Sequence, residues 1–286
     1  MRISSLYNKG KCVFSLEVFP PKKTSSIDSI YTTIDGLKEM RPDFISVTYG
    51  AGGNVADTKT RDIAEIIKRK YGIESMAHLT CVNTEMADAE TILNDFSSHG
   101  IENILALRGD INPDIPSKND FKYASDLARY IAARGDFDIG GACYPEVHSE
   151  ASDAESDLDH LKIKVDAGVK FLISQLFFDN SFFYSFRERA AKKGVFVPIS
   201  AGIMPVTNKK QIERMVTMCG ASVPQTLAKL MSKYADDPAA LTEAGIEYAV
   251  EQITGLIMNG VDGVHLYTMN NPAVAQKIYD GIKGLL

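Results

Sequence analysis

Short apolar runs rich in β-branched residues alternate along the chain with longer amphipathic stretches. Each apolar run is followed by a turn and then by a segment with helical spacing of its apolar positions. The pattern predicts eight β-strands, at 12–19, 43–49, 74–81, 103–109, 137–144, 171–178, 196–203 and 263–269. This alternation is typical of parallel βα units.

Amphipathic segments between the strands predict helices. One covers 59–70, where three isoleucines lie on one face, and another covers 84–99, where Thr84 suits an N-cap. The connection between the seventh and eighth strands is longer than the others and contains three helical patterns, at 207–218, 224–233 and 240–259. An additional helix is therefore expected in this connection.

Eight strands with following helices predict an α/β protein of the (β/α)8 TIM-barrel class, with residues 1–286 as one catalytic domain. The main alternative is a doubly wound open sheet. That fold would be expected to show a G-x-G-x-x-G turn after its first strand, whereas FSLEVFPPKK (14–23) contains no glycine.

Composition narrows the class of protein. The chain has 286 residues, of which 45% are hydrophobic and 24% charged, and its net charge is -6. Net acidity without a Lys/Arg block argues against nucleic acid as a partner. No uncharged apolar run approaches the ~20 residues of a membrane span, and MRISSLYNKGK lacks a signal-peptide core, so we expect a cytoplasmic, non-membrane protein. The four dispersed cysteines are expected to be buried thiols.

Polar residues recur where the predicted strands end, which is where barrel enzymes hold their chemistry. They are Glu17, Thr48 and Tyr49, His78 and Thr80, the turn Arg108-Gly109-Asp110, Tyr144-Pro145-Glu146 with His148, Gln175 and Asp179, and His265 and Tyr267. The five histidines form no H-x-H or H-E-x-x-H pattern, which disfavours a metal, and no lysine lies in a strand body to form a Schiff base. The set suits a large flat cofactor and a single proton transfer.

These segments together resemble the methylenetetrahydrofolate reductase family of flavin-dependent barrels. The matching segments are FSLEVFPPK (14–22), DFISVTYGAGG (43–53), AHLTCV (77–82), ILALRGD (104–110), YASDL (123–127), YPEVH (144–148), KVDAGVKFLISQLFFD (164–179) and GIMPVTN (202–208). The resemblance implies an oxidoreductase of one-carbon metabolism, on the route to methionine. Such an enzyme reduces 5,10-methylenetetrahydrofolate to 5-methyltetrahydrofolate by hydride transfer from reduced flavin.

The resemblance also implies residue roles. Glu17 matches the general acid that opens the folate ring to an iminium, which requires a carboxyl pKa raised by burial. Asp110 matches an aspartate beside the flavin, and Gln175 and Gln211 match folate contacts, Gln175 also near the nicotinamide. The positions that match FAD contacts are Thr48, Tyr49, Ala51, His78, Arg108, Gly109, Asp110, Tyr123, Ala124, Tyr144, His148, Ala151, Asp157 and Lys164. Arg108 and Lys164 would offset pyrophosphate charge, and Asp157 would accept from ribose hydroxyls.

Three positions depart from the bacterial pattern of the family. Met215 replaces a phenylalanine that stacks on the pyridine nucleotide, Asn271 replaces a folate-contacting arginine, and His160 replaces an asparagine near the adenosine. FMN therefore stays open beside FAD. The electron donor is NADH, NADPH or a partner subunit, in a homo- or hetero-oligomer. The alternative function is a folate- or flavin-binding barrel subunit of a redox complex without turnover.

Overall fold

The strands close into a barrel in the computed structural model, which describes residues 1–21, 28–49, 58–82, 84–110 and 120–286. The strands are β1 (Val13–Val18), β2 (Phe44–Val47), β3 (Glu74–Thr80), β4 (Asn103–Leu107), β5 (Asp138–Cys143), β6 (Phe171–Ser174), β7 (Ile199–Ile203) and β8 (Gly263–Tyr267). Each pairs in parallel with the next, and β8 pairs with β1. The predicted (β/α)8 barrel is thus confirmed.

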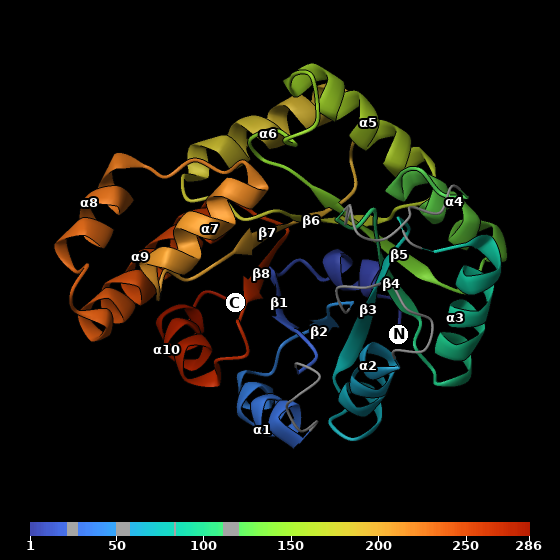
Figure 1. The fold of residues 1–286 in the computed structure, drawn as a ribbon, viewed down its shortest axis with the longest axis horizontal. Helices are drawn as coiled ribbons and strands as arrows, with labels where there is room; N and C mark the ends of the chain where they lie inside the picture. The colour runs from blue at the N-terminus through green and yellow to red at the C-terminus, as the bar shows by residue number, and fades with distance from the viewer. Residues whose placement is uncertain (22–27, 50–57, 83, 111–119) are drawn as a thin grey trace.

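Helices surround this barrel in chain order (Figure 1). They are α1 (Asp28–Leu37), α2 (Lys59–Arg69), α3 (Met86–Ser98), α4 (Ala124–Arg134), α5 (Ala154–Asp166), α6 (Asn180–Lys192), α7 (Lys209–Cys219), α8 (Gln225–Lys233), α9 (Pro238–Met258) and α10 (Pro272–Ile282), with 3-10 helices η1 (Ile3–Lys9) and η2 (Lys38–Met40). All three helical patterns predicted between β7 and β8 are helices in the structure; because a βα unit needs one, the connection has two additional helices where one was expected. Of these, α8 lies farthest from the barrel (Figure 1).

Several strand ends differ from the prediction by one to three residues, and two local predictions differ in a more informative way. The strand predicted over 171–178 ends at Ser174. The prediction was too long because Leu176, Phe177 and Phe178, which are buried, continue the apolar run beyond the end of the strand. The N-cap of α3 is Glu85 and not Thr84. The Thr84 hydroxyl instead donates to the carbonyl of Thr80 at 2.7 Å, while Glu85 forms a reciprocal capping box with Asp88.

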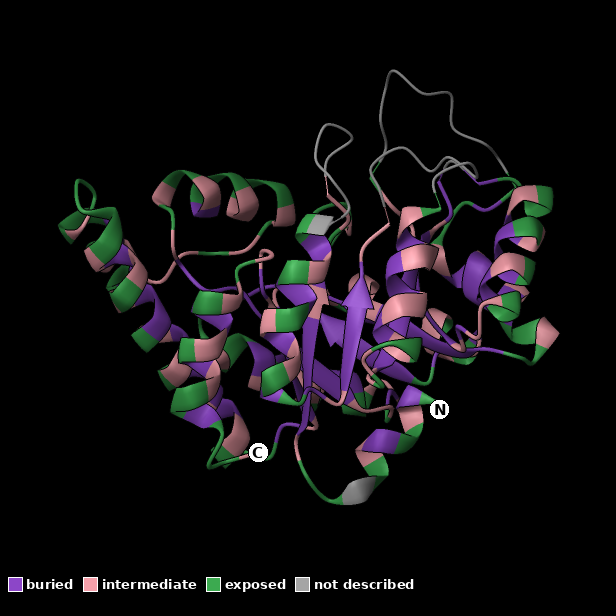
Figure 2. Ribbon diagram, turned by 90° about the horizontal axis from the view of Figure 1, so that it is seen from below, coloured by how far each residue is buried: buried purple, intermediate pink, exposed green. Residues whose placement is uncertain are grey.

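Strand side chains alternate between two apolar environments. Along β1, Phe14, Leu16 and Val18 belong to the main cluster that packs strands against helices, whereas Val13 belongs to a second cluster inside the barrel with Phe44. Figure 2 shows buried strands enclosed by helices whose outer faces are exposed. This two-sided burial explains the near-continuous apolar runs of the strands.

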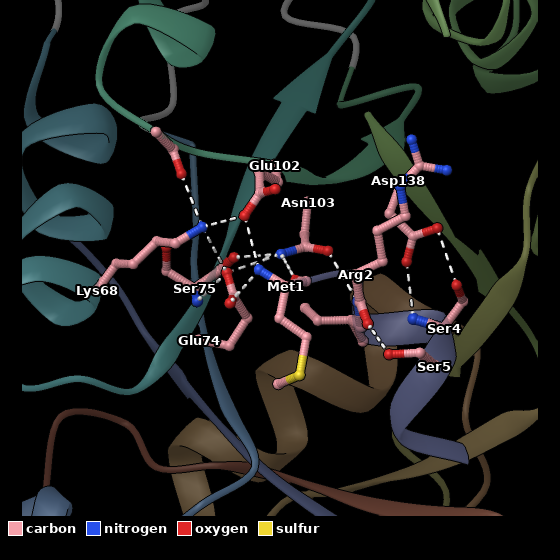
Figure 3. A network of polar contacts seen from close by, with 12 residues as sticks. Met1, Arg2, Ser4, Ser5, Lys68, Glu74, Ser75, Glu102, Asn103 and Asp138 are labelled. Carbon is pink, nitrogen blue, oxygen red and sulfur yellow. Dashed lines mark hydrogen bonds and ion pairs between the residues drawn. The ribbon is translucent and has the colours of Figure 1, made fainter. Parts of the chain in front are cut away.

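The 3-10 helix η1 closes the barrel at the amino ends of β3, β4 and β5 (Figure 3). Its Ile3 and Leu6 are buried in the interior cluster. The side chain of Asn103, the first residue of β4, accepts from the Ile3 N–H at 2.9 Å and donates to the Ser75 carbonyl at 3.1 Å. The sequence prediction did not include this helix, because a seven-residue segment lacks a measurable helical period.

The cysteines are free, but only two are buried as predicted. Cys81 and Cys143 are buried, while Cys12 and Cys219 are partly exposed. Within the described ranges, no helix is long and apolar enough to cross a membrane.

Candidate active site

A cavity of about 590 Å³ opens at the carboxyl ends of the strands, and Glu17 lies in its wall. Glu17 is aligned with Ser46 on β2 and with Tyr267 on β8. Its Oε2 is 3.6 Å from Nε2 of His78 and 3.6 Å from Nε2 of His265. The side chain of Glu17 is 19% exposed. A single carboxylate thus lies between two imidazoles in the mouth of the barrel.

His265 supports Glu17 from inside the barrel. The ring is fully buried, its Nδ1 is 2.8 Å from Oγ of Ser15, and it stacks on Phe44 with centroids 6.0 Å apart. Its Nε2 also lies 3.4 Å from Oγ of Ser46. The sequence interpretation left His265 without a role, whereas the fold places it in contact with the predicted acid.

The pKa of Glu17 does not follow the sequence expectation. Burial raises the pKa of this carboxyl, as expected, but the neighbouring His265, the charge that each of the two imidazoles carries when it is protonated, and the neighbouring Ser46 lower the pKa more. The net pKa is below the ordinary value of a glutamate. The expectation of a raised pKa is therefore wrong for this structure, because burial was considered without the neighbours that closure of the barrel supplies.

His78 is a buried imidazole on β3. Burial lowers the pKa of its ring to about 4, so the ring is neutral at pH 7. Its Nε2 is buried and has no hydrogen-bond partner among the described residues. Such an atom carries a free-energy cost that a polar group of a bound molecule would remove.

The turn Arg108-Gly109-Asp110 follows β4 at the rim. Gly109 has φ +85°, and a Cβ there would lie 2.9 Å from Cβ of Thr80, so the chain passes too close for a side chain. Arg108 forms a two-pronged ion pair with Glu150, at 2.5 and 2.6 Å, which raises the pKa of the guanidinium. Asp110 is exposed and lines the mouth cavity.

A second cavity of about 460 Å³ lies beside the first and is lined by residues of α4 and α5. Lys164 reaches into it from α5, donates to the Ala142 carbonyl at 2.7 Å, and has a pKa lowered by burial. Asp157 accepts from the His148 N–H at 3.1 Å. The two cavities share five lining residues, which are Leu107, Arg108, Ala142, Tyr144 and His148. The shared wall makes them neighbouring parts of one elongated site.

The fold gathers the predicted site residues in two groups. Those in the mouth cavity are Glu17, Thr48, Tyr49, His78, Arg108, Gly109, Asp110, Tyr144, His148 and Gln175. Those in the side cavity are Arg108, Tyr123, Ala124, Tyr144, His148, Ala151, Asp157 and Lys164. Gln211 differs: within the described chain it lines neither cavity. Ala51 lies outside the described residues.

The three departures from the family pattern have different surroundings. Met215 lines the mouth cavity and His160 lines the side cavity. Asn271 caps α10, where its side chain accepts from the Val274 N–H at 3.2 Å.

Sequence reasoning missed several polar residues of the site. Ser15 and Ser46 face the same interior as Glu17, and Glu150 holds Arg108. The signal for the serines was present, because Ser15 and Glu17 are two residues apart and side chains with a period of two share a face of a strand. Glu150 carried no such signal, since it lies in a turn.

The fold and site define a class of protein. A parallel eight-stranded barrel with an acid, imidazoles and an arginine at the carboxyl ends of its strands is a (β/α)8-barrel enzyme. The sequence model of the methylenetetrahydrofolate reductase family matches residues 2–283. The chain therefore belongs to the methylenetetrahydrofolate reductase family and is an enzyme of that activity, which confirms the resemblance seen in its motifs.

Curated relatives agree with the family. The 5,10-methylenetetrahydrofolate reductases of Pectobacterium carotovorum and Escherichia coli are each 37% identical over 94% of this chain and 90% of their own length. A methylenetetrahydrofolate reductase (NADH) of Arabidopsis thaliana is 35% identical over 94% of this chain and 48% of its own.

A solved structure agrees with the fold. A Clostridium thermocellum protein, described as binding two copies of 5-methyl-5,6,7,8-tetrahydrofolic acid, superposes with a TM-score of 0.66. The match has 13% sequence identity and covers 100% of this chain and 99% of that one. At this identity the likeness supports the fold alone.

Proposed function

We propose that this chain reduces 5,10-methylenetetrahydrofolate to 5-methyltetrahydrofolate by hydride transfer from a reduced flavin, with Glu17 as the proton donor. The observation that carries the proposal is the position of Glu17. It is a partly exposed carboxyl between two imidazoles, in a cavity that continues past Arg108 into a second cavity. Residues 1–286 form the single catalytic domain of this proposal.

The residues of the two cavities fit a flavin. The buried, unpartnered Nε2 of neutral His78 can bond a polar atom at the edge of the flavin ring. Arg108 and Lys164 can bind the negative charge of a diphosphate. Asp157 offers a carboxylate to ribose hydroxyls. Two joined cavities of about 590 and 460 Å³ favour FAD over FMN, because a dinucleotide has two aromatic parts to bury. A bound flavin supplies the hydride.

Glu17 must carry a proton to open the folate ring. Its side chain is 19% exposed, and bound folate and flavin would remove the remaining water contact. Loss of water disfavours the charged form and raises the pKa from its lowered value, so the proton is taken up in the complex that uses it. The negative charge of Asp110 at the rim favours positive charge that develops on the folate.

Gln175 is the folate contact that the geometry supports best, because it lines the mouth cavity with Glu17. The reductant is NADH, NADPH or a donor subunit, and Met215 offers apolar contact without ring stacking. An oligomer with itself or with a donor subunit belongs to the same proposal. Comparing NADH, NADPH and ferredoxin-type donors as reductants of the enzyme-bound flavin assigns this step.

Glu17→Gln tests the proposed function. In stopped-flow measurements, we expect the variant to slow oxidation of the reduced flavin by methylenetetrahydrofolate by roughly 10²–10⁴-fold, since a positioned acid contributes about that much. Reduction of the flavin by its donor is expected to stay within about twofold, because no proton from Glu17 enters that step. The exposed Glu247 on α9 gives the matched control Glu247→Gln.

Two results would contradict the proposal. Purified protein that is colourless and takes up no added flavin would exclude flavin dependence. A Glu17→Gln variant with a wild-type folate step would exclude Glu17 as the acid and favour a binding subunit without turnover. Mass spectrometry of the released cofactor separates FAD from FMN.

A further inference from the structure

The turn after β8 contains two consecutive non-glycine residues in the left-handed backbone region. Met269 has φ 52° and Asn270 has φ 53°, and Arg41 is the other non-glycine residue with positive φ among the described ones. Side chains other than glycine rarely adopt this conformation, and residues that do so collect at functional sites. The turn follows directly on the strand that pairs with Glu17.

The start of α10 does not explain this conformation. The helix is capped by Asn271, whose side chain accepts from the Val274 N–H. The side chain of Asn270 does not cap the helix, and it forms hydrogen bonds with Phe19, the residue that follows β1. The turn is closed by a hydrogen bond from the Asn271 N–H to the Thr268 carbonyl at 2.9 Å, with Met269 and Asn270 as its two left-handed central residues, and it places the Asn270 amide beside the end of β1.

Thr268 and Asn270 hold the backbone around Glu17. Thr268 is a buried residue, 1% exposed, whose hydroxyl donates to the Glu17 carbonyl at 2.6 Å and accepts from the Asn270 N–H at 3.2 Å. Asn270 accepts from the Phe19 N–H at 3.1 Å and donates to the Phe19 carbonyl at 2.8 Å. Both backbone groups of Phe19 are thus bound by one amide.

These bonds begin where the strand pairing ends. The register between β1 and β8 runs from Val13 opposite Gly263 to Glu17 opposite Tyr267. Beyond that pair, two side chains of the turn replace the backbone ladder. The left-handed conformation at Asn270 brings its amide alongside Phe19, and Met269 joins the wall of the mouth cavity.

We infer that Thr268 and Asn270 are positioning residues for Glu17, which fix the end of β1 so that the carboxyl stays between His78 and His265. The inference rests on the proposed role of Glu17 as proton donor. Glu17 is the last residue of β1 that pairs with β8, so beyond it the β8 side of β1 is held, among the described residues, only by these side-chain bonds. A displacement of the carboxyl by about 1 Å can cost roughly 100-fold in rate. Clamping the main chain of Glu17 and Phe19 opposes such a displacement.

Three substitutions test the clamp. Asn270→Gly removes the amide but tolerates positive φ, so it loses the clamp without added strain. Asn270→Ala removes the same bonds and keeps the strain, and Thr268→Val removes the hydroxyl at constant shape. The control Asn259→Ala removes a 2.8 Å bond from an asparagine amide to the Gly255 carbonyl at the exposed end of α9. Circular dichroism and thermal melts confirm that each variant is folded.

The readout is the two half-reactions of the flavin-loaded enzyme. We expect Asn270→Gly and Thr268→Val each to slow the folate step by about 10–100-fold. Reduction of the flavin by dithionite should stay within about twofold, and Asn259→Ala should match wild type in both steps. The double variant Glu17→Gln with Asn270→Gly should be no slower than Glu17→Gln alone, because the clamp acts through that carboxyl.

A folded Asn270→Gly variant with a wild-type folate step overturns the inference and leaves the proposed function standing. A double variant whose losses multiply also overturns it, since Asn270 would then act independently of Glu17. If Glu17→Gln itself keeps the wild-type rate, the proposed proton donor fails first and the inference fails with it. The Glu17→Gln measurement thus distinguishes the two failures.

Discussion

At the scale of single residues, the site depends on how its titratable groups set one another's charge. Glu17 lies 3.6 Å from each of two imidazoles, and its pKa is below the ordinary value although burial raises it. The pKa of His78 is lowered to about 4 by burial. At pH 7, Glu17 is therefore ionised and His78 is neutral. Glu17 can act as an acid only if binding of folate and flavin leads it to take up a proton.

The buried His78 predicts how stability depends on pH. Between pH 6.5 and 4 the unfolded chain binds a proton at this residue that the folded chain does not bind, so the free energy of unfolding falls as the pH falls through this range. The loss by pH 4 is about 3 kcal/mol from this group. The pKa of Glu17 is lowered in the folded protein, so this group stabilises the fold at pH values above the ordinary pKa of a glutamate. That stabilisation is lost as the pH falls below the ordinary pKa.

His78→Asn should remove that dependence. Urea unfolding at several pH values should show that the variant loses about 3 kcal/mol less stability than wild type between pH 6.5 and 4. His160→Asn, at an exposed position of α5, is measured beside it as the matched control. Equal slopes for wild type and His78→Asn would mean that the folded protein protonates His78 at its ordinary pKa.

At the scale of elements, turns and a short helix position the site at one end and close the barrel at the other. The turn after β4 passes Thr80 at a distance that only Gly109 permits, which sets where Arg108 and Asp110 lie. At the other end, η1 places Ile3 and Leu6 in the barrel interior. Strand patterns predict neither feature, because both depend on a close approach between segments far apart in sequence.

Gly109→Ala tests the close approach after β4. Gly135, the C-cap of α4, has a similar φ of +79°, but a Cβ added there would meet no atom of another described segment within 4 Å. Gly135→Ala therefore measures the backbone cost alone, about 1–2 kcal/mol. Gly109→Ala should cost about 1–3 kcal/mol more, because its Cβ overlaps Thr80. Denaturant unfolding of both variants gives the difference, and equal losses would argue against the steric reason.

Asn103→Ala tests the contribution of η1 to stability. The Asn103 side chain is fully buried and bonds the Ile3 N–H and the Ser75 carbonyl, so its loss should lower the free energy of unfolding by about 1–3 kcal/mol. The folate step should keep its rate, because Asn103 lies at the end of the barrel opposite Glu17. The exposed Asn94 gives the control Asn94→Ala, with a change of at most about 0.5 kcal/mol. A slower folate step in Asn103→Ala would show coupling between the two ends.

At the scale of the whole molecule, the barrel mouth and the space beside α4 and α5 form one elongated site with a common wall. Net charge says little about this site. The chain carries -6 overall, yet Arg108 and Lys164 lie together in the side cavity. The same cavity is also lined by Glu150, which pairs with Arg108, and by Asp157, so the proposed binding of an anionic cofactor depends on how these local charges are placed and not on the net charge.

Ala124→Phe should separate the two parts of this site. The larger side chain fills the side cavity from the first residue of α4, so affinity for FAD should fall by about tenfold or more, while affinity for FMN should be unchanged. Ala133→Phe places the same ring on the exposed face of the same helix and should change neither affinity. Fluorescence titrations of the apoprotein measure both constants. An equal loss of FAD and FMN binding would argue against a dinucleotide spanning the cavities.

The sequence by itself determined the barrel, the number of strands, the end at which the polar residues gather, and the family. These follow from local periodicity and from motifs, which need no knowledge of long-range contacts. Tertiary structure alone decided that His265 lies against Ser15, 250 positions away, that the pKa of Glu17 is lowered, and that Gln211 stays outside both cavities. The physical reason is that strand register and barrel closure determine which distant side chains meet. Those neighbours determine the charge and burial of each group and the cavity that it lines.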